Sequence, residues 1–367
     1  MSKPRRRKQK KQFKPELKLR QFAATELSDQ LAAQHSAAGL PRFMVDTVAG
    51  AYAPTDAELT IEGFGAAATR PVTLRANTLK ATAEDIVAAL DAAGIAHQTV
   101  TWYPDAFILP EAQVSDLWDL DIYRDGKIYL QSLSSMMPPL VLGAQAGEDI
   151  LDMCAAPGGK TTQIAALTQG QAHLTACEMS IPRAEKLESN LHRQGAKNVP
   201  VMRIDARELD EFFRFDRILL DAPCTGTGTV ISGNEKSLRG LTEQLLSKCA
   251  RSQRALLDRA MGALKPGGTL VYSTCSILPQ ENEDALQEAL DKHMDCELIP
   301  LDGTPSESEA RRTQEAGEEP RIESNALTEA IAAGQVSAIA NGLPGTLTIP
   351  PSRDFEGFYI ALIRKRS

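Results

Sequence analysis

Apolar and polar positions alternate in blocks over the second half of the chain, from Glu148 onward. Short apolar runs are each followed by a turn and then by a longer stretch whose apolar residues recur at helical spacing. This rhythm is typical of a parallel sheet flanked by helices, so an α/β fold is predicted. The predicted strands are residues 150–154, 174–177, 199–204, 216–220 and 269–273, with a closing strand at 358–363.

A different pattern precedes this region and predicts a small α+β domain that ends near residue 140. Residues 26–56 are mostly helical in their periodicity, and residues 71–77 form a short strand-like run. Thr82 and Asp85 have the spacing of a capping box, and the apolar residues after them recur at helical intervals. The segment after Thr82 is therefore predicted to be a helix that buries one face.

Local signals also mark where elements of the second half begin and end. Ser180 suits an N-cap, Pro182 suits a first turn, and Gly195 suits the end of the same helix. Residues 300–320 are rich in Glu, Ser, Thr and Arg, and this composition predicts an exposed acidic loop.

The 367 residues carry a formal net charge of −8, but the charge is unevenly distributed. Residues 1–20 hold ten Lys and Arg against one Glu, a net charge of +9, so the remainder carries −17, which is −8 less +9. We expect residues 1–25 to form a basic arm that is disordered until it binds the phosphates of a nucleic acid. A solubilising tail is the alternative explanation of the same charges.

Hydropathy and cysteine spacing argue against several classes of protein. No stretch approaches the roughly 18 uninterrupted apolar residues of a membrane span, and the N-terminus lacks the apolar core of a secretory signal. The expected location is the cytoplasm, where structural disulfides are uncommon. The six cysteines are all more than twenty residues apart, so no CxxC pair indicates a zinc site and no metal is expected.

A glycine-containing segment, Asp152 to Thr161, joins the first predicted strand of the sheet to the following helix. Its adjacent glycines, Gly158 and Gly159, allow the backbone to approach a ligand where a Cβ atom would collide. The segment ends like a phosphate-binding P-loop, but that motif requires glycine at the position of Cys154. No GxGxxG motif is present either, so a small-molecule site of another kind is predicted.

Carboxylates follow the next three predicted strands in turn: Glu178, Asp205 and Asp221. Ligands of open α/β sheets bind at the carboxyl ends of the strands. Glu178 is placed to accept hydrogen bonds from ribose hydroxyls, and Asp205 to accept one from an adenine amino group. Each acid alone is a common loop residue or helix cap, but their regular spacing favours a pocket for an adenosine-containing molecule.

Two cysteines lie where predicted strands end in polar turn residues. Cys224 follows the fourth predicted strand and Cys275 follows the fifth, so both are expected at the mouth of the sheet. A cysteine is ordinarily a small buried apolar residue, which suits Cys177, Cys249 and Cys296. The positions of Cys224 and Cys275 favour a chemical role instead.

Three segments occur in order along the chain: LDMCAAPGGKT at 151–161, DAPCTGTG at 221–228, and TCS at 274–276 followed by PQENE at 279–283. Together they resemble the signature motifs of the Sun/Nop (RsmB/Nop) family of RNA cytosine-5 methyltransferases. The similarity spans most of residues 70–365, although residues 350–354 match the family only loosely. It includes RANT at 75–78, QSLSS at 131–135 and GFYIA at 357–361.

The resemblance implies a class I methyltransferase domain in residues 141–367, with a Rossmann-like sheet covered by helices on both faces. It also implies that residues 26–140 are an α+β RNA-binding domain. The implied cofactor is S-adenosylmethionine. Its expected ligands are the loop residues Cys154, Ala155, Ala156, Pro157, Gly158, Gly159 and Lys160, together with Glu178, Asp205 and Asp221.

A covalent mechanism is implied as well, and it agrees with what the reaction requires. Carbon 5 of cytosine is a poor nucleophile until a thiolate adds to carbon 6, and Cys275 matches the nucleophile of the family. Asp221, if protonated or bridged, would stabilise charge at ring nitrogen 3. Lys160 is placed to contact Asp221 and to lower the pKa of a nearby thiol. Cys224 matches the cysteine that assists release of the proton from carbon 5, which must precede elimination of the Cys275 thiol.

The expected function is therefore methylation of a specific cytosine in RNA, at a base that leaves its stack. DNA cytosine-5 methyltransferases use the cysteine after the fourth strand as nucleophile, so the pair of cysteines favours RNA. Residues 230–235 resemble the ribosomal branch of the family, which favours rRNA over tRNA. A tRNA substrate, a non-catalytic ribosome-assembly factor and a small-molecule methyltransferase are the alternatives. A monomer is expected.

Overall fold

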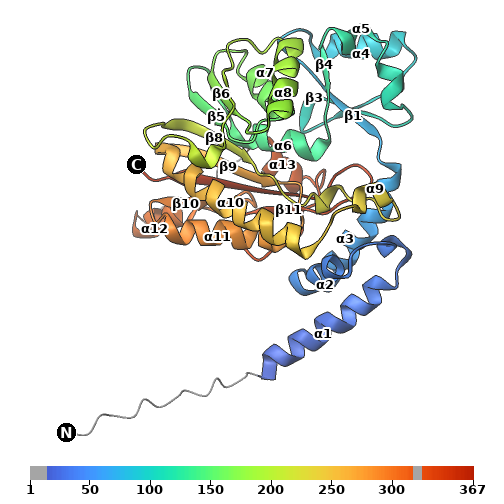
Figure 1. The fold of residues 1–367 in the computed structure, drawn as a ribbon, viewed down its shortest axis with the longest axis vertical. Helices are drawn as coiled ribbons and strands as arrows, with labels where there is room; N and C mark the ends of the chain where they lie inside the picture. The colour runs from blue at the N-terminus through green and yellow to red at the C-terminus, as the bar shows by residue number, and fades with distance from the viewer. Residues whose placement is uncertain (1–14, 317–324) are drawn as a thin grey trace, which may run out of the picture.

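The computed structural model describes residues 15–316 and 325–367 and contains two β-sheets (Figure 1). The larger sheet comprises β5 Asp149–Asp152, β6 His173–Cys177, β7 Val201–Met202, β8 Phe215–Asp221, β9 Leu264–Thr274, β10 Cys296–Ile299, β11 Leu347–Ile349 and β12 Phe358–Lys365. Their order is β10-β12-β9-β8-β5-β6-β7, with β11 paired to β12. Strands β9, β8, β5, β6 and β7 are parallel, and β12 is antiparallel to each of its neighbours.

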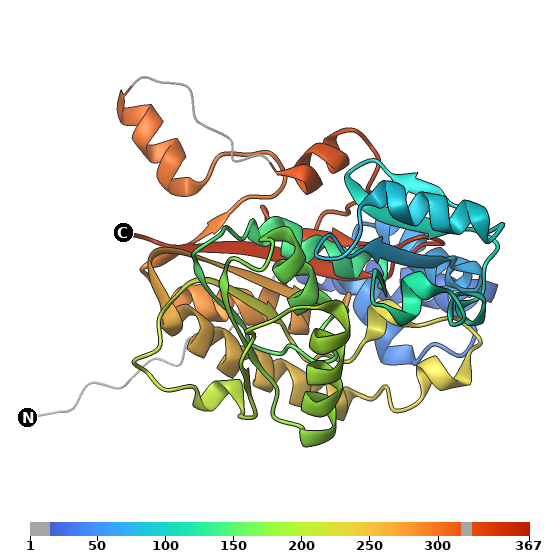
Figure 2. The ribbon, with the colours of Figure 1, turned by 90° about the horizontal axis from the view of Figure 1, so that it is seen from above.

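Helices cover both faces of the larger sheet (Figure 2). On one face, Ile150 and Ile360 belong to a core shared with helices α6, α7, α8 and α13. On the other face, Leu151 and Tyr359 belong to a core shared with α10 and α11. Successive strand residues point to opposite faces, so the central strands are apolar on both sides. The bounds are α6 Leu133–Leu142, α7 Gly159–Leu167, α8 Ile181–Gln194, α10 Glu243–Ala263, α11 Glu283–Lys292 and α13 Ala326–Ala332.

The strand order places a switch point between β5 and β8. The chain passes from β5 through β6 to β7 in one direction and then returns to β8 and β9 on the other side of β5. A crevice opens at the carboxyl ends of the strands at such a point, where open α/β sheets bind their ligands. The predicted α/β fold, with a Rossmann-like sheet between two layers of helices, is confirmed.

A four-stranded antiparallel sheet forms the small α+β domain that the upstream pattern predicted. Its order is β2-β3-β1-β4, and its core contains Leu74, Ile86 and Phe107. Thr82 accepts a hydrogen bond from the Asp85 amide and donates its own amide to the Asp85 carboxylate, so the predicted capping box is confirmed. The bounds are β1 Val72–Ala76, β2 Gln98–Val100, β3 Tyr103–Leu109, β4 Ile128–Leu130, α4 Ala83–Ala92 and α5 Asp121–Arg124.

The N-terminal helices pack on the larger domain rather than on the small sheet. Phe64 shares a core cluster with Ile277 and Leu278, which follow β9. A Cβ atom at Gly63 would lie 1.8 Å from the carbonyl oxygen of Pro351, so only glycine fits this contact. The predicted domain of residues 26–140 therefore contains two parts with separate cores. The bounds are α1 Pro15–Ala32, α2 Arg42–Ala51 and α3 Pro54–Ala66, with the short α9 Glu235–Leu238 beside them.

Helix ends agree with most of their sequence signals. Pro182 lies in the first turn of α8, and Gly195 ends the helix with a φ of +74°, as expected. Ser180 occupies the N-cap position, but its side chain makes no capping hydrogen bond. No helix within residues 15–316 and 325–367 is long and apolar enough to cross a membrane.

Two predictions about irregular segments are wrong. Helix α1 begins at Pro15, so the arm predicted to be disordered to residue 25 is helical from Pro15 on; residues 1–14 lie outside the described residues. Helix α12, Glu307–Ala316, occupies much of the predicted acidic loop, of which residues 317–320 are not described. Glu, Ala and Arg favour helix strongly, and Ser306 accepts a hydrogen bond from the Glu309 amide at the start of α12. The polar composition therefore indicated exposure but not the absence of secondary structure.

Candidate active site

A cavity of about 460 Å³ opens at the carboxyl ends of β5, β8 and β9, beside the switch point of the sheet. The small domain supplies part of its wall through Tyr129. The predicted nucleophile, Cys275, lines the cavity from the end of β9. The wall also includes these predicted cofactor residues: Cys154, Ala155, Ala156, Pro157, Gly159, Lys160 and Asp221.

The loop between β5 and α7 takes its shape from its two glycines. Gly158 has a φ of +107°, a backbone conformation that side chains other than glycine rarely adopt, and it lies just outside the cavity wall. A Cβ atom at Gly159 would lie 3.1 Å from the Tyr129 ring. A side chain there would crowd the small domain. Gly159 itself lines the cavity, so the backbone at the start of α7 is accessible to a bound molecule.

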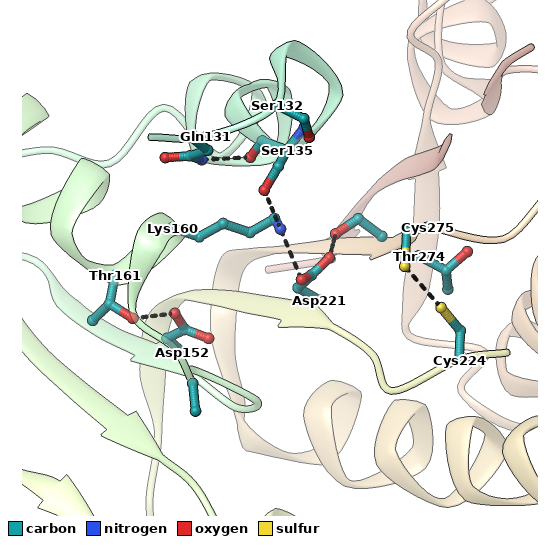
Figure 3. Close-up of polar contacts among 12 residues, drawn as sticks. Gln131, Ser132, Ser135, Asp152, Lys160, Thr161, Asp221, Cys224, Thr274 and Cys275 are labelled. Atoms are coloured by element: carbon teal, nitrogen blue, oxygen red, sulfur yellow. Dashed lines mark hydrogen bonds and ion pairs between the residues drawn. The ribbon is translucent and has the colours of Figure 1, made fainter. Parts of the chain in front are cut away.

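Lys160 and Asp221 form an ion pair in the cavity wall (Figure 3). Lys160 Nζ lies 2.8 Å from Asp221 Oδ2 and also donates to Ser135 Oγ at 2.7 Å. Ser273 donates to the other carboxylate oxygen of Asp221 at 2.8 Å. Burial lowers the pKa of Lys160, but the Asp221 carboxylate, with smaller contributions from Cys275 and Asp152, opposes this effect, and the net result is a pKa above the usual value. The contact expected between Lys160 and Asp221 is present, and it joins a charged ammonium group to a bridged carboxylate.

Asp152 is a further buried carboxylate in the cavity wall, and it was not anticipated from the sequence. It lies at the end of β5, where its Oδ2 accepts a hydrogen bond from Thr161 at 2.7 Å. Its Oδ1 has no hydrogen-bond partner within the described part of the chain. Burial, reinforced by the Asp221 charge, raises the pKa of Asp152 to about 6. An unpaired buried acceptor is costly, so Asp152 indicates a ligand that donates a hydrogen bond there.

The sulfur atoms of Cys224 and Cys275 lie 3.3 Å apart, although 51 residues separate them in the sequence (Figure 3). Cys224 lies in the loop after β8, and Cys275 directly follows the neighbouring parallel strand β9. The hydrogen bond with Cys275, together with burial, raises the pKa of Cys224 well above its usual value. Cys224 is therefore a neutral thiol suited to donate its proton in this hydrogen bond.

Two buried side chains that were not anticipated fix the cysteine-bearing loops: Glu281 joins the two loops, and Asn282 holds the loop that carries Cys275. Glu281 accepts hydrogen bonds from the Thr225 amide at 2.7 Å, and from the Thr225 and Ser276 hydroxyls at 2.5 Å each. Asn282 accepts from the Thr274 hydroxyl at 2.6 Å and donates to the Ser276 carbonyl at 2.9 Å. Burial raises the pKa of Glu281 above its usual value, although these hydrogen bonds oppose the shift. The PQENE segment was the available signal, but it does not show what these side chains contact.

Glu178 and Asp205, the predicted ribose and adenine ligands, do not line the cavity. Glu178 is buried and forms an ion pair with Arg183 at 3.3 Å. Arg183 also donates to the Ala156 carbonyl at 2.8 Å, so Glu178 is linked to the glycine-containing loop. Asp205 is instead paired with Arg207, whose hydrogen bond lowers the pKa of Asp205 below its usual range. Contact between Asp205 and an adenine ring stays a prediction.

Arg75 connects the small domain to the cavity. Its fully buried guanidinium donates to Gln131 Oε1 at 2.9 Å, to the Gly159 carbonyl at 2.9 Å and to the Thr162 hydroxyl at 2.7 Å. The same group lies 5.2 Å from the centre of the Tyr129 ring. These bonds satisfy Nε and Nη2, whereas Nη1 has no partner within the described residues. Because buried polar groups that lose their partners are costly, the bonds favour one arrangement of the small domain against α7.

Two family models match the chain. Residues 139–364 match the model described as 16S rRNA methyltransferase RsmB/F. Residues 40–115 match the ferredoxin-like domain of RsmF/B-like methyltransferases. The first match covers more than half of the chain and includes the glycine-containing loop and both cysteines that face each other.

Curated relatives and a solved structure agree with these matches. The chain is 40% identical over 249 residues to ribosomal RNA small subunit methyltransferase F of Aeromonas salmonicida, covering 65% of this chain and 52% of that protein. It is 35% identical over 343 residues to the protein of the same name from Cronobacter sakazakii, covering 91% and 65%. The chain thus spans less than two thirds of the length of these relatives. A methyltransferase homolog protein from Pyrococcus horikoshii has 31% identity and a TM-score of 0.68, covering 93% of this chain and 98% of that structure.

Proposed function

Because the chain belongs to the RsmB/F family of 16S rRNA methyltransferases, we propose that it transfers a methyl group from S-adenosylmethionine to carbon 5 of a cytosine in ribosomal RNA. The observation that carries the proposal is the pair of thiols 3.3 Å apart, one of them in the wall of a cavity that also holds Lys160 and Asp221. The names of the relatives favour ribosomal RNA over tRNA as the substrate.

The residues around the cavity fit S-adenosylmethionine. The unpaired Oδ1 of Asp152 suits the ammonium group of the methionine part, and the glycine-containing loop allows the close approach that such a ligand requires. Glu178, linked to this loop through Arg183, is the proposed acceptor for the ribose hydroxyls. When bound, S-adenosylmethionine supplies an electrophilic methyl group from its sulfonium.

Cys275 is the proposed nucleophile. The neutral thiol of Cys224 donates a hydrogen bond to the Cys275 sulfur, and a hydrogen bond of this kind stabilises a thiolate. The thiolate adds to carbon 6 of cytosine, and the electron pair of the 5,6 double bond moves onto carbon 5 and, by conjugation, onto ring nitrogen 3. The Lys160 ammonium group stabilises the negative charge that develops at ring nitrogen 3, and Asp221 holds this group in place. Carbon 5 thereby becomes nucleophilic enough to accept the methyl group.

Cys224 is the proposed base for the last step. Once Cys275 is bonded to carbon 6, the hydrogen bond that holds the pKa of Cys224 high is lost, so Cys224 releases its proton to solvent more readily. The Cys224 thiolate then removes the proton from carbon 5. The electron pair re-forms the 5,6 double bond and expels Cys275 as a thiolate, which restores the starting arrangement.

The proposal extends to the setting in which the protein works, a monomer in the cytoplasm that needs no metal ion. Every group in the mechanism belongs to one chain, so a monomer contains the whole site. In the proposed mechanism a cysteine thiolate is the nucleophile and protein side chains stabilise the charge that develops on the base. No metal-bound nucleophile is therefore required. The named relatives are bacterial, and bacterial ribosomes lie in the cytoplasm.

Transfer of labelled methyl groups from S-adenosylmethionine tests the function directly. We expect the full chain to place label in 5-methylcytidine of small-subunit ribosomal RNA, offered either as free RNA or within small subunits. Bulk tRNA serves as the comparison substrate. Absence of label from every RNA would overturn the proposal, whereas label confined to tRNA would retain the reaction and overturn the ribosomal substrate.

Replacing Glu281 with alanine should lower kcat by about 10- to 100-fold, because misplacing reacting groups by about 1 Å has effects of this size. The substitution removes the bonds that join Thr225 to Ser276, so the cysteine beside each residue loses its fixed position. Affinity for S-adenosylmethionine should be unchanged. Glu281→Gln, which keeps part of the bonding, should have an intermediate kcat.

The matched control is Asp284→Ala, an exposed acidic residue on the same segment. Turnover and the rate of Cys275 alkylation by iodoacetamide should be measured for each variant, since alkylation requires neither RNA nor cofactor. If Glu281→Ala resembled Asp284→Ala in both measurements, Glu281 would have no positioning role.

A further inference from the structure

A shallow basic groove of about 590 Å³ lies where the small domain meets the larger one, and it is separate from the cavity described above. Figure 1 shows α8 of the larger domain beside the small domain, which carries β4 and α5. The small domain and α8 each contribute cations to the groove. We define it by the residues that line it: Lys80, Arg124, Asp125, Lys127, His192 and Arg193.

The two sides of this groove are held together by hydrogen bonds to the last turn of α8. Lys80 Nζ donates to the backbone carbonyls of Asp125 and Arg193, at 2.7 Å each. Asn77 Nδ2 donates to the Gln194 carbonyl at 2.7 Å, and a Cβ atom at Gly126 would lie 2.2 Å from the Arg193 carbonyl oxygen. These contacts satisfy carbonyls that a helix end leaves unpaired. The groove is therefore formed before any ligand arrives.

The charge of the groove is opposite to that of the rest of the molecule. Four Lys and Arg side chains and one histidine line it, against a single carboxylate, whereas residues 21–367 together carry −17. Arg124 is paired with Asp119 outside the groove, and Lys127 lies 3.9 Å from Asp125. Arg193 lies over the Tyr123 ring at 5.0 Å, which orients its guanidinium without neutralising it. An excess of positive charge is therefore concentrated at this seam.

The groove is close to the cavity that contains the cysteines. Lys127 lies directly before β4. Tyr129, within β4, and Gln131, directly after it, both line the cavity. A strand advances about 3.3 Å per residue, so roughly 7 to 13 Å separate the groove from the cavity wall. On the other side, Asn190 donates to the Pro157 carbonyl of the glycine-containing loop, one helical turn before Arg193. This separation corresponds to a short step along a nucleic-acid strand.

We propose that this groove binds the phosphate backbone of the substrate RNA next to the target cytosine. The inference rests on the proposed function, which makes RNA the substrate. Phosphates are the ligand that a preformed, cation-lined groove on an acidic protein attracts most strongly, and such contacts position an RNA without reading its bases. The groove thus determines how the RNA strand enters the cavity, and each of the two domains supplies one side of the groove.

The test is the double substitution Lys127→Glu with Arg193→Glu in the full chain. Both side chains line the groove, whereas Lys80 is left in place because it holds the seam together. We expect the affinity for a small-subunit rRNA fragment, measured by fluorescence anisotropy, to fall by more than about tenfold at moderate salt. The slope of log affinity against log salt should decrease in magnitude by about 1 to 2, because two phosphate contacts are lost.

Lys186→Glu is the matched control, since Lys186 is an exposed cation on the same helix but outside the groove. It should change neither the affinity nor the salt slope, and S-adenosylmethionine should bind equally to all three proteins, which reports that the fold is intact. If the double variant had an unchanged affinity and salt slope while the unsubstituted protein methylated RNA, the proposed role of the groove would be wrong and the proposed function would be retained. Failure of the unsubstituted protein to bind or methylate any RNA would instead overturn the proposed function. If polyglutamate at equal charge displaced the RNA, the groove would be assigned to an acidic protein partner and the proposal that it binds RNA would be wrong.

Discussion

Replacement of Cys275 with alanine is expected to lower kcat by more than about 10³-fold, because removing a covalent nucleophile has effects of at least this size in other enzymes. Cys275 is the thiol that lines the cavity, and its sulfur lies 3.3 Å from that of Cys224, which is the donor in the proposed mechanism. Without it, carbon 5 of the cytosine stays a poor nucleophile, however well the base and the cofactor are positioned. Binding of S-adenosylmethionine should be little affected.

Methyl transfer from labelled cofactor to small-subunit ribosomal RNA provides the measurement for this variant. Cys249→Ala is the matched control, because Cys249 is a free, partly buried cysteine on α10 that does not line the cavity. The control should retain its activity. Label transferred by Cys275→Ala at a rate near that of the unsubstituted protein would show that another group attacks carbon 6.

Replacement of Cys224 with alanine should stop turnover at a different point and trap the protein on its RNA. Addition of Cys275 to carbon 6 and transfer of the methyl group remain possible, since neither step requires Cys224 to bond to the base. Removal of the carbon 5 proton then lacks its proposed base, so Cys275 cannot be expelled. We expect a covalent complex of protein and methylated RNA to accumulate, with turnover reduced by about 10²- to 10⁴-fold, the usual effect of a general base.

Electrophoresis under denaturing conditions, with the RNA labelled, detects this complex directly. Cys224→Ala should show a retarded band that disappears after nuclease treatment, and the double variant with Cys275→Ala should not. Mass spectrometry of the trapped peptide should place the RNA on Cys275. A trapped complex that persists in the double variant would contradict both assignments at once, whereas normal turnover by Cys224→Ala would assign proton removal to another group.

Much of the fold follows from signals between residues that are close in sequence. The alternation of strands and helices after residue 148, the capping box at Thr82 and the glycine that ends α8 are all present in the structure. Each depends on backbone conformation and on side chains within a turn or two of one another, which neighbouring residues encode directly. The acidic segment shows the limit of composition, since α12 forms where polar residues suggested a loop.

The sequence alone also identified candidate binding and reactive residues, because the glycine-containing loop and the two cysteines directly follow predicted strands. The distance of 3.3 Å between Cys224 and Cys275 was decided by the tertiary structure, through the pairing of β8 with β9. The same holds for Glu281, which joins the two cysteine-bearing loops, and for Arg75, which reaches Gly159 across 84 residues. Periodicity specifies which face of an element is buried, but not which distant element it meets, because that choice depends on packing and strand order over the whole chain.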